Sequence, residues 1–359
     1  MNINMNALLQ KYLTTVKKFI PQPESKSFIG LDIGTHSCKL VELVHKGGKY
    51  QLTNFTIEPI TNGNPKDSIK KAWAKISDPA RSPTTAVFGK GTLIRFITIP
   101  RMSLEELKSS FTLEADKYFP FPQDQIYMDC YILDSKGKEN KMSVMIAAAK
   151  KELIDGRVKV LADLGLHPEL ITLNSIAVAN AVGALGLKAD SISTPGPKEP
   201  AVAILDMGEE VSNLTILVDN LPRFTRDIFI GGQEMTKSIS RMMGMSLEEA
   251  EKLKYQPGDK LPDIFNAADS VLMDFVSEIR LSFDYFVTEK NTTIPLLLFT
   301  GGGSMLSGLM DILAKHLEVK VMRWDPIEFL DLAPGISRET VASQGSRLIV
   351  ALGLALSQE

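Results

Sequence analysis

The two halves of the sequence repeat one pattern, and this duplication constrains the fold more than any other feature. In the first half an apolar strand ends at Asp32, a turn with Gly34 follows, and a second strand begins. The same order recurs at Asp206 and Gly208, after a charged and Pro-rich break at 187–200. Because internal repeats mark units of similar structure, we expect an α/β protein built from two related lobes.

Each Asp-x-Gly hairpin has the chemistry of a phosphate-binding turn. Backbone N–H groups of such turns bind phosphate oxygens, and glycine permits close approach and a positive φ. Asp32 and Asp206 end buried strands, where a lone charge is costly, so we expect them to hold Mg²⁺ through water. Taken alone, either hairpin is more often an ordinary turn. The other candidate phosphate ligands are Gly34, Thr35, His36, Ser37, Lys39, Gly208 and Ser212.

Two further segments supply candidate adenosine contacts. An apolar strand at 295–300 runs into three consecutive glycines, which leave no side chain between the backbone and a flat ring at a helix start. The other segment has two glycines before a helix with acidic and basic residues, a pattern that usually marks a solvated face. The candidate adenosine residues are Gly232, Glu251, Lys254, Gly301, Gly302, Gly303 and Met305.

The order of these motifs resembles that of the actin, heat-shock chaperone and sugar kinase superfamily, including a lysine seven residues after the first Asp. Within the superfamily the chain is similar to the PilM proteins of type IV pili. Segments close to GLDIGSSSIKLVEL, EAEKYIPF and AAAKKELV in that family correspond here to GLDIGTHSCKLVEL, LEADKYFPF and AAAKKELI. The likeness includes EIRLSFDYF, FTGGGSML and ALGLAL, and it extends from Phe28 to Leu356.

This resemblance implies an actin-like fold of two ribonuclease H-like lobes, with a small α-β-β-α subdomain inserted in the first lobe as in FtsA. We expect the C-terminal helix at 341–357 to pack back on the first lobe. The expected divisions are a leader and tether at 1–27, the first lobe at 28–102 and 173–200, the insert at 103–172, and the second lobe at 201–340, with a helical subdomain at 236–290.

The resemblance also implies a function, that of a cytoplasmic ATP-binding adaptor of type IV pilus assembly, peripheral to the inner membrane. ATP with Mg²⁺ would lie between the lobes. The implied partner is the cytoplasmic N-terminal peptide of PilN, held in a groove between the first lobe and the insert. Through PilN the adaptor would couple the inner-membrane alignment complex to the pilus motor, and self-association stays open.

The sequence supports catalysis and tight nucleotide binding less well than it supports the fold. Asn174 and Ser175, near the place of the catalytic group in related enzymes, are not bases, so we expect at most a slow ATPase. Glu209 and Glu210 lie beside the second hairpin and would repel a triphosphate unless they point away or act on Mg²⁺. An FtsA-like membrane-attached filament and a small-molecule kinase of the same superfamily are the alternatives.

Composition narrows the partners further. A net charge of −3 lacks the basic field of nonspecific nucleic-acid binding, and Cys38 and Cys130 have no metal-site or disulfide spacing. No apolar run is long enough for a membrane span. Residues 1–27 carry four lysines and one glutamate, a net charge of +3, on an amphipathic pattern. We expect a helix over 1–20 that contacts an anionic membrane weakly or docks on protein.

Overall fold

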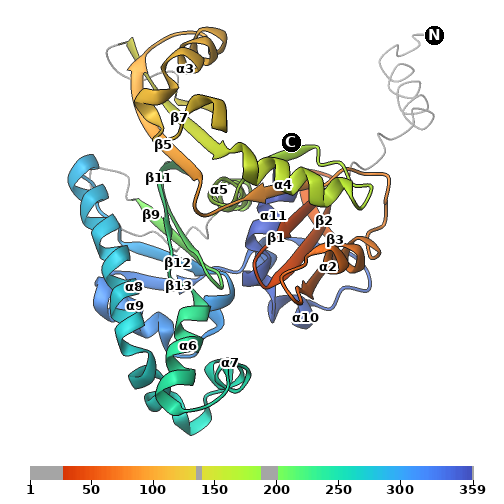
Figure 1. Cartoon of the computed structure of the whole chain (residues 1–359), viewed down its shortest axis with the longest axis vertical. Helices are drawn as coiled ribbons and strands as arrows, with labels where there is room; N and C mark the ends of the chain where they lie inside the picture. Colours follow the sequence, from red (N-terminus) through yellow and green to blue (C-terminus); the bar gives the residue numbers. More distant parts are fainter. Residues whose placement is uncertain (1–26, 135–139, 187–200, 358–359) are drawn as a thin grey trace, which may run out of the picture.

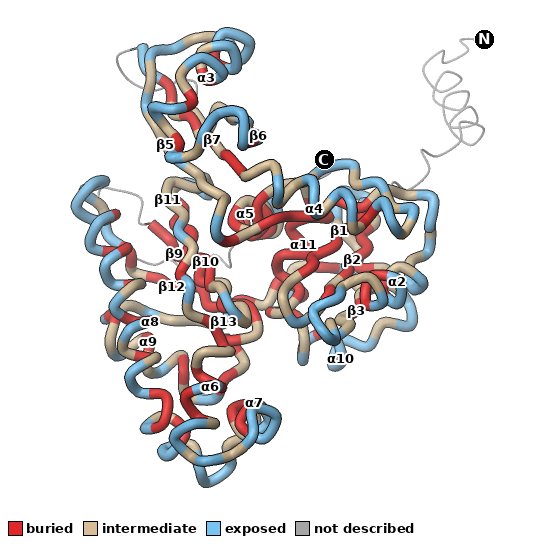
Figure 2. Tube along the Cα trace, viewed as in Figure 1, coloured by how far each residue is buried: buried red, intermediate tan, exposed pale blue. Residues whose placement is uncertain are grey.

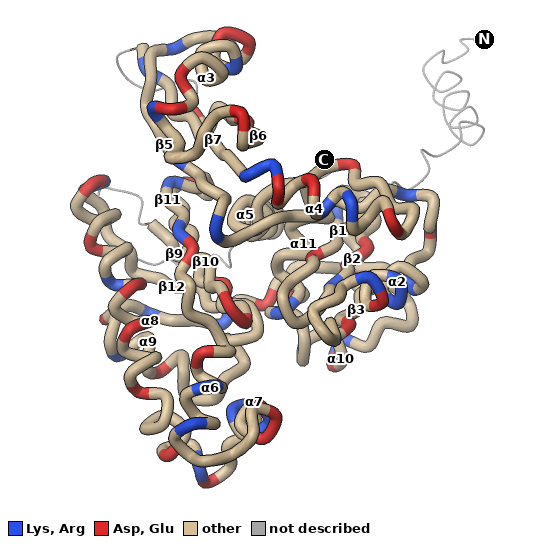
Figure 3. The backbone as a smooth tube through the Cα atoms, in the orientation of Figure 1, with Lys and Arg blue, Asp and Glu red and all other residues tan. Residues whose placement is uncertain are grey.

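The computed structural model describes residues 27–134, 140–186 and 201–357, so the leader helix expected over 1–20 lies outside the described residues. Two lobes lie side by side, and a smaller unit projects from their junction (Figure 1). Basic and acidic residues are interspersed along the backbone of both lobes and this unit (Figure 3). Of the helices in the described part of the chain, none is long and apolar enough to cross a lipid bilayer.

The first lobe is built on a six-stranded sheet in the order β14-β3-β2-β1-β4-β8. The central strand β1 (Ser27–Ile33) runs antiparallel to β2 (Ser37–Lys46) and parallel to β4 (Thr84–Val87). Its other elements are β3 (Lys49–Pro59), α2 (Lys66–Trp73), β8 (Leu170–Leu173), α5 (Asn174–Leu185), η6 (Pro326–Phe329), β14 (Asp331–Leu332) and α10 (Arg338–Ala342).

The second lobe repeats this topology in a five-stranded sheet of order β11-β10-β9-β12-β13. Here β9 (Val202–Met207) runs antiparallel to β10 (Ser212–Val218) and parallel to β12 (Leu296–Thr300). The predicted duplication and the α/β class are therefore confirmed. The remaining elements are β11 (Leu221–Ile228), α6 (Gly232–Met243), α7 (Leu247–Tyr255), η4 (Gly258–Lys260), α8 (Leu261–Lys290), η5 (Gly302–Met305), α9 (Leu309–Leu317) and β13 (Lys320–Arg323).

The projecting unit, called the insert below, is a three-stranded sheet with one helix on it. Its strands β5 (Thr92–Pro100), β7 (Lys141–Lys150) and β6 (Ile126–Asp134) lie in the order β5-β7-β6, and η1 (Gln123–Gln125) precedes β6. Helix α3 (Leu104–Tyr118) begins with the predicted capping box, in which Ser103 and Glu106 bond each other's backbone N–H. Leu107 and Phe111 of α3 pack on Val144 and Ile146 of β7 and cover one face of this sheet.

The insert begins earlier in the chain than expected. We assigned 28–102 to the first lobe, but β5 within that range pairs antiparallel with β7 of the insert. Its apolar residues Leu93, Ile97 and Ile99 join the core beneath α3. After the insert, α4 (Lys151–Ala162) returns to the first lobe and buries Leu161 there. Alternation predicts a strand but does not specify its sheet, because strand pairing is a long-range contact.

The core of the molecule gathers around two helices, α5 and α11 (Ile349–Leu356), which follows η7 (Gly345–Leu348). Every residue of α11 is buried, and α5 and α11 share one apolar cluster with residues of both large sheets (Figure 2). Two glycines allow this close packing. A Cβ on Gly30 of β1 would lie 1.8 Å from the Ala351 carbonyl oxygen, and one on Gly353 would lie 1.8 Å from the Ala177 carbonyl oxygen.

Candidate functional site

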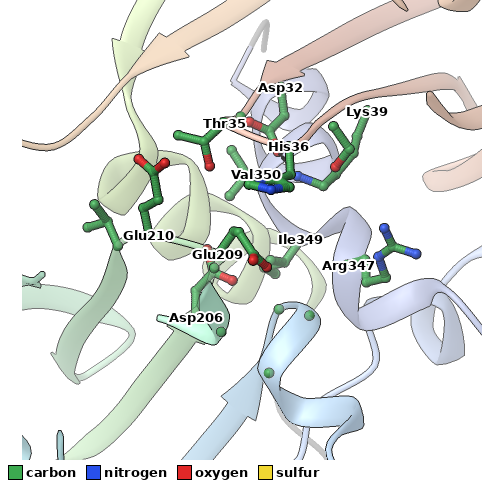
Figure 4. Close-up of a pocket in the computed structure, with 18 of the residues that line it drawn as sticks. Asp32, Thr35, His36, Lys39, Asp206, Glu209, Glu210, Arg347, Ile349 and Val350 are labelled. Atoms are coloured by element: carbon green, nitrogen blue, oxygen red, sulfur yellow. Dashed lines mark hydrogen bonds and ion pairs between the residues drawn. The ribbon is translucent and has the colours of Figure 1, made fainter. Parts of the chain in front are cut away.

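The two Asp-x-Gly hairpins line one cleft of about 760 Å³ between the lobes, a volume typical of small-molecule sites. Asp32, Thr35, His36 and Lys39 come from the first lobe, and Asp206, Glu209 and Glu210 face them from the second (Figure 4). Of the residues predicted from sequence, those that line the cleft are Asp32, Gly34, Thr35, His36, Ser37, Lys39, Asp206, Gly208, Gly232, Glu251, Gly301, Gly302, Gly303 and Met305.

The two hairpin turns share one backbone geometry. The Gly34 amide donates to the Ser37 carbonyl oxygen at 3.1 Å, and the Gly208 amide donates to the Val211 carbonyl oxygen at 3.2 Å. Neither glycine has the positive φ that we expected. Space explains the glycines instead, because a Cβ on Gly208 would lie 2.6 Å from the Val211 carbonyl oxygen and one on Gly34 would lie 3.2 Å from that of Ser37.

The two aspartates of the hairpins have different environments. Asp32 is 4% exposed, and its carboxylate accepts a hydrogen bond from the Lys39 ammonium at 2.8 Å. The Asp206 carboxylate receives no hydrogen bond from any described residue and faces the cleft. Desolvation, together with the charge of Asp32, raises the pKa of Asp206 to about 7, although Lys39 opposes this shift. At neutral pH, Asp206 is therefore only about half ionised, and a cation bound beside it would favour the carboxylate form.

We expect this carboxylate to make the ligand-free protein less stable as the pH rises. The folded chain holds a proton on Asp206 up to about pH 7, whereas an unfolded Asp loses it near 3.8, so unfolding free energy falls between these pH values. In buffer with EDTA, we compare the unfolding free energy of Asp206→Asn with that of the wild type. The advantage of the variant should be about 2 kcal/mol larger at pH 8 than at pH 5. Thermal unfolding at both pH values measures this difference.

The matched control is Asp274→Asn on the exposed face of α8, which should follow the wild type at both pH values. A constant difference between Asp206→Asn and the wild type from pH 5 to pH 8 would contradict the raised pKa.

The second hairpin is held by helix α6. The backbone amides of Gly232 and Gln233 donate to the carbonyl oxygens of Gly208 and Glu209, at 3.0 Å and 2.8 Å. Two of the free N–H groups at the start of α6 are therefore engaged by the hairpin and are not available to a phosphate. Burial raises the pKa of the Glu209 carboxyl, with Lys254 and His36 lowering it and Glu251 and Glu210 raising it. The environment of Glu209 in the ligand-free cleft thus favours the protonated form of its carboxyl group.

Two predicted ligands do not reach the cleft. The Ser212 hydroxyl is fully buried and donates to the Ile230 carbonyl oxygen at 2.7 Å. The Lys254 ammonium is enclosed by the Gly232 carbonyl oxygen at 3.0 Å, the Thr236 hydroxyl at 2.7 Å and the Glu251 carboxylate at 2.7 Å. All three of its donors are engaged, so Lys254 positions Glu251 and the glycine backbone rather than touching a ligand.

The triple glycine packs against the second hairpin. A Cβ on Gly301, whose φ is 79°, would lie 2.3 Å from Asp206 Oδ1, and one on Gly303 would lie 2.2 Å from Met207 Sδ. Larger residues at these positions would displace the hairpin that carries Asp206. The glycines therefore allow the second hairpin to lie close to the glycine loop, and they also leave space for a ligand.

Several cleft residues carried no sequence signal that we used. Asn213 and Asp227 lie on paired strands and bond each other at 2.9 Å, and Tyr255 follows Lys254. Their polar or aromatic side chains, in the half of the chain that holds the second hairpin, were the sequence feature that could have indicated them. Arg347 had none, because its segment reaches the cleft only through the fold. The cleft residues that were not predicted are Ile57, Pro59, Phe88, Val211, Asn213, Asp227, Tyr255, Gln256, Gln344, Arg347, Ile349 and Val350.

Two lobes of one topology, with paired Asp-x-Gly hairpins and a glycine loop around a shared cleft, define a protein of the actin-like fold. The model of the family described as type IV pilus assembly protein PilM matches residues 30–359. The chain belongs to this PilM family of type IV pilus assembly proteins. The resemblance identified from sequence is thereby confirmed.

Solved structures agree with this assignment. A PilM–PilN type IV pilus biogenesis complex matches with a TM-score of 0.80 and 27% identity, over 92% of this chain and 98% of that chain. The ethanolamine utilization protein EutJ from Carboxydothermus hydrogenoformans matches with a TM-score of 0.51 and 14% identity, over 98% of both chains, which shows the fold alone.

Curated relatives include the cell division protein FtsA. FtsA of Helicobacter pylori strain 26695 is 29% identical over 127 residues, covering 35% of this chain and 24% of FtsA. FtsA of Enterococcus hirae is 22% identical over 257 residues, covering 65% of this chain and 54% of FtsA. The chain thus spans between about a quarter and about half of these relatives' length.

Proposed function

We propose that this chain is a nucleotide-binding adaptor of type IV pilus assembly, which binds the cytoplasmic N-terminal peptide of PilN. The main support for this proposal is the cleft, where both Asp-x-Gly hairpins and the glycine loop meet. The chain that carries this cleft is a member of the PilM family. The solved PilM–PilN complex supports the choice of partner, because it matches nearly the whole chain.

The proposed ligand of the cleft is ATP with Mg²⁺. The hairpin backbones of Gly34 and Gly208 would bind phosphates, and the glycine loop with Glu251 would bind the adenosine. Among the described residues no group of three His, Cys, Asp or Glu is placed to hold a metal ion. Mg²⁺, which usually keeps several waters, would therefore bind Asp32 and Asp206 through water and take the remaining ligands from phosphates.

The proposed peptide groove uses the face of the insert sheet that α3 leaves uncovered. Strand register places Phe96 of β5, Met145 of β7 and Tyr131 of β6 in one row on this face. Phe96 and Met145 are half-buried, and Tyr131 is 62% exposed. Nearer the first lobe the same face continues through Ile94 and Ala147, which pack on first-lobe residues. An apolar strip between insert and lobe suits an extended or helical peptide.

Two hydrogen bonds connect the segments that flank the insert to the cleft. At the entry to the insert, the Gly89 amide donates to Asp227 of the second lobe at 3.1 Å, and Lys90 lies over the Phe229 ring. At its exit, the Arg157 side chain of α4 donates to the Ile33 carbonyl oxygen, next to Asp32, at 3.2 Å. Closure of the lobes on a nucleotide would move both anchors, so nucleotide state would tune peptide binding.

Hydrolysis is not required for such a role. Asn174 lines the cleft without being a base, so any ATPase activity would be slow and would serve conformational change. We further propose that the adaptor acts beside the inner membrane, through PilN and the pilus motor.

Binding of a fluorescent peptide from the PilN N-terminus tests this function. For the full chain we expect ATP with Mg²⁺ to tighten peptide binding by about fivefold or more, within the usual range of coupling between sites. Tyr131→Asp should weaken binding by about tenfold, because it places a charge on the apolar strip. Asp227→Ala should remove the response to ATP, because it removes the acceptor for Gly89. Fluorescence anisotropy gives these dissociation constants.

Matched controls lie outside the groove and the cleft. Met242→Asp changes a side chain of the second lobe that is 66% exposed, and it should bind the peptide as the wild type does. Full peptide binding by Tyr131→Asp would refute the groove, and an unchanged response to ATP in Asp227→Ala would refute the link.

A further inference from the structure

Arg347 occupies a segment of the first lobe that contacts the second lobe at the cleft. It lies on η7, which leads directly into α11. The preceding residue, Ser346, accepts two hydrogen bonds through its carbonyl oxygen, from the Gly301 amide at 2.9 Å and from the Thr300 hydroxyl at 3.1 Å. The backbone of Arg347 is thus anchored to the glycine loop, and its half-buried side chain lines the cleft (Figure 4).

The charges around the cleft are strongly unequal. Lys39 and Arg347 are the Lys and Arg residues among the described lining residues. Lys39 is already paired with Asp32 at 2.8 Å. The side chain of Arg347 makes no hydrogen bond or ion pair with any described residue. The carboxylates that line the cleft are Asp32, Asp206, Glu209, Glu210, Asp227 and Glu251.

An unpaired guanidinium in a partly buried site gains most from an anionic ligand, because its planar donors match phosphate oxygens. A nucleotide held beside Glu209 and Glu210 has the complementary need, since its phosphates are repelled by both. Resting on the proposed binding of nucleotide, we propose that Arg347 binds the phosphate chain and offsets the acidic second hairpin. Arg347 is then a nucleotide-binding residue supplied by the first-lobe segment that leads into α11.

A phosphate contact fits this site better than a contact with the base. The base carries no negative charge, so stacking on it would leave the excess of carboxylates unopposed. Arg347 lies near Tyr255, where burial raises the pKa of the phenol to about 12 and the charge of Arg347 opposes that rise. The charged group of Arg347 is therefore close enough to Tyr255, itself a lining residue, to act on it inside the cleft.

Isothermal titration of Arg347→Gln with three probes tests the proposal. We expect the affinity for ATP with Mg²⁺ to fall by about tenfold or more, as for loss of a charge-assisted hydrogen bond, while adenosine binds as it does to the wild type. ADP should show an intermediate or equal loss. The matched control is Arg338→Gln, an exposed position on α10 that does not line the cleft and should change none of the three affinities.

A double variant tests whether Arg347 offsets the charge of Glu209. In the double variant Arg347→Gln with Glu209→Gln, removal of the acid should restore most of the lost ATP affinity, and failure to restore it would overturn the offset. An equal loss for adenosine and ATP in Arg347→Gln would overturn the phosphate contact, as would unchanged ATP binding. A wild-type chain that binds none of the three probes would refute the proposed nucleotide function itself. Thermal unfolding checks that each variant is folded.

Discussion

Gly353→Ala is expected to destabilise the chain by about 3 kcal/mol, a large overpacking effect for one methyl group. The added Cβ would lie 1.8 Å from the Ala177 carbonyl oxygen, and backbone on both sides prevents relief by a rotamer change. Helix α11 would have to move away from α5, and the core shared by both lobes would loosen. The midpoint of urea unfolding measures the change.

Gly156→Ala is the matched control for this substitution. Gly156 lies within α4, and a Cβ there would meet no atom within 4 Å. Removal of glycine from a helix should stabilise the chain by about 0.5–1 kcal/mol. Wild-type stability in Gly353→Ala would mean that α11 does not pack on α5 as the structure has it.

Loss of bound nucleotide in Asp206→Ala and Asp32→Ala is the second large effect that we expect. Mass spectrometry of the nucleotide released from purified protein should detect at most about a tenth of the wild-type amount in either variant, a loss of about 1.4 kcal/mol or more in binding. Asp206 supplies the unpaired carboxylate of the cleft, and Asp32 holds the Lys39 ammonium at 2.8 Å. Each variant removes one of the two proposed contacts to hydrated Mg²⁺.

Asp274→Ala on the exposed face of α8 is the control and should retain the wild-type amount. Undiminished nucleotide in both cleft variants would remove the assignment of the cleft. Retention in Asp32→Ala alone would instead make Asp206 the principal contact to the metal.

Local sequence patterns predicted the parts of the fold that local contacts build. The hairpins after Asp32 and Asp206 and the capping box at Ser103 depend on residues within a few positions of each other. Such patterns did not show that β5 belongs to the insert, because its partner β7 lies about forty residues away in the chain.

The candidate site divides in the same way. The motif residues Gly208 and Gly301 could be read from sequence, because glycine spacing around a turn is a local property. Arg347 could not, since its segment reaches the cleft only when α11 packs into the first lobe. Ser212 and Lys254 looked available in sequence, but contacts with Ile230, Gly232 and Thr236 engage their donors.

The sequence by itself determined the duplicated α/β fold, the family and the motifs that surround the cleft, because these depend on residue types and spacings. The tertiary structure decided which of those groups face the cleft and in what state of charge. Desolvation raises the pKa of Asp206, Asp32 is paired with Lys39, and Arg347 is left without a partner. Burial and ion pairing arise between residues distant in the chain, so only the folded structure specifies them.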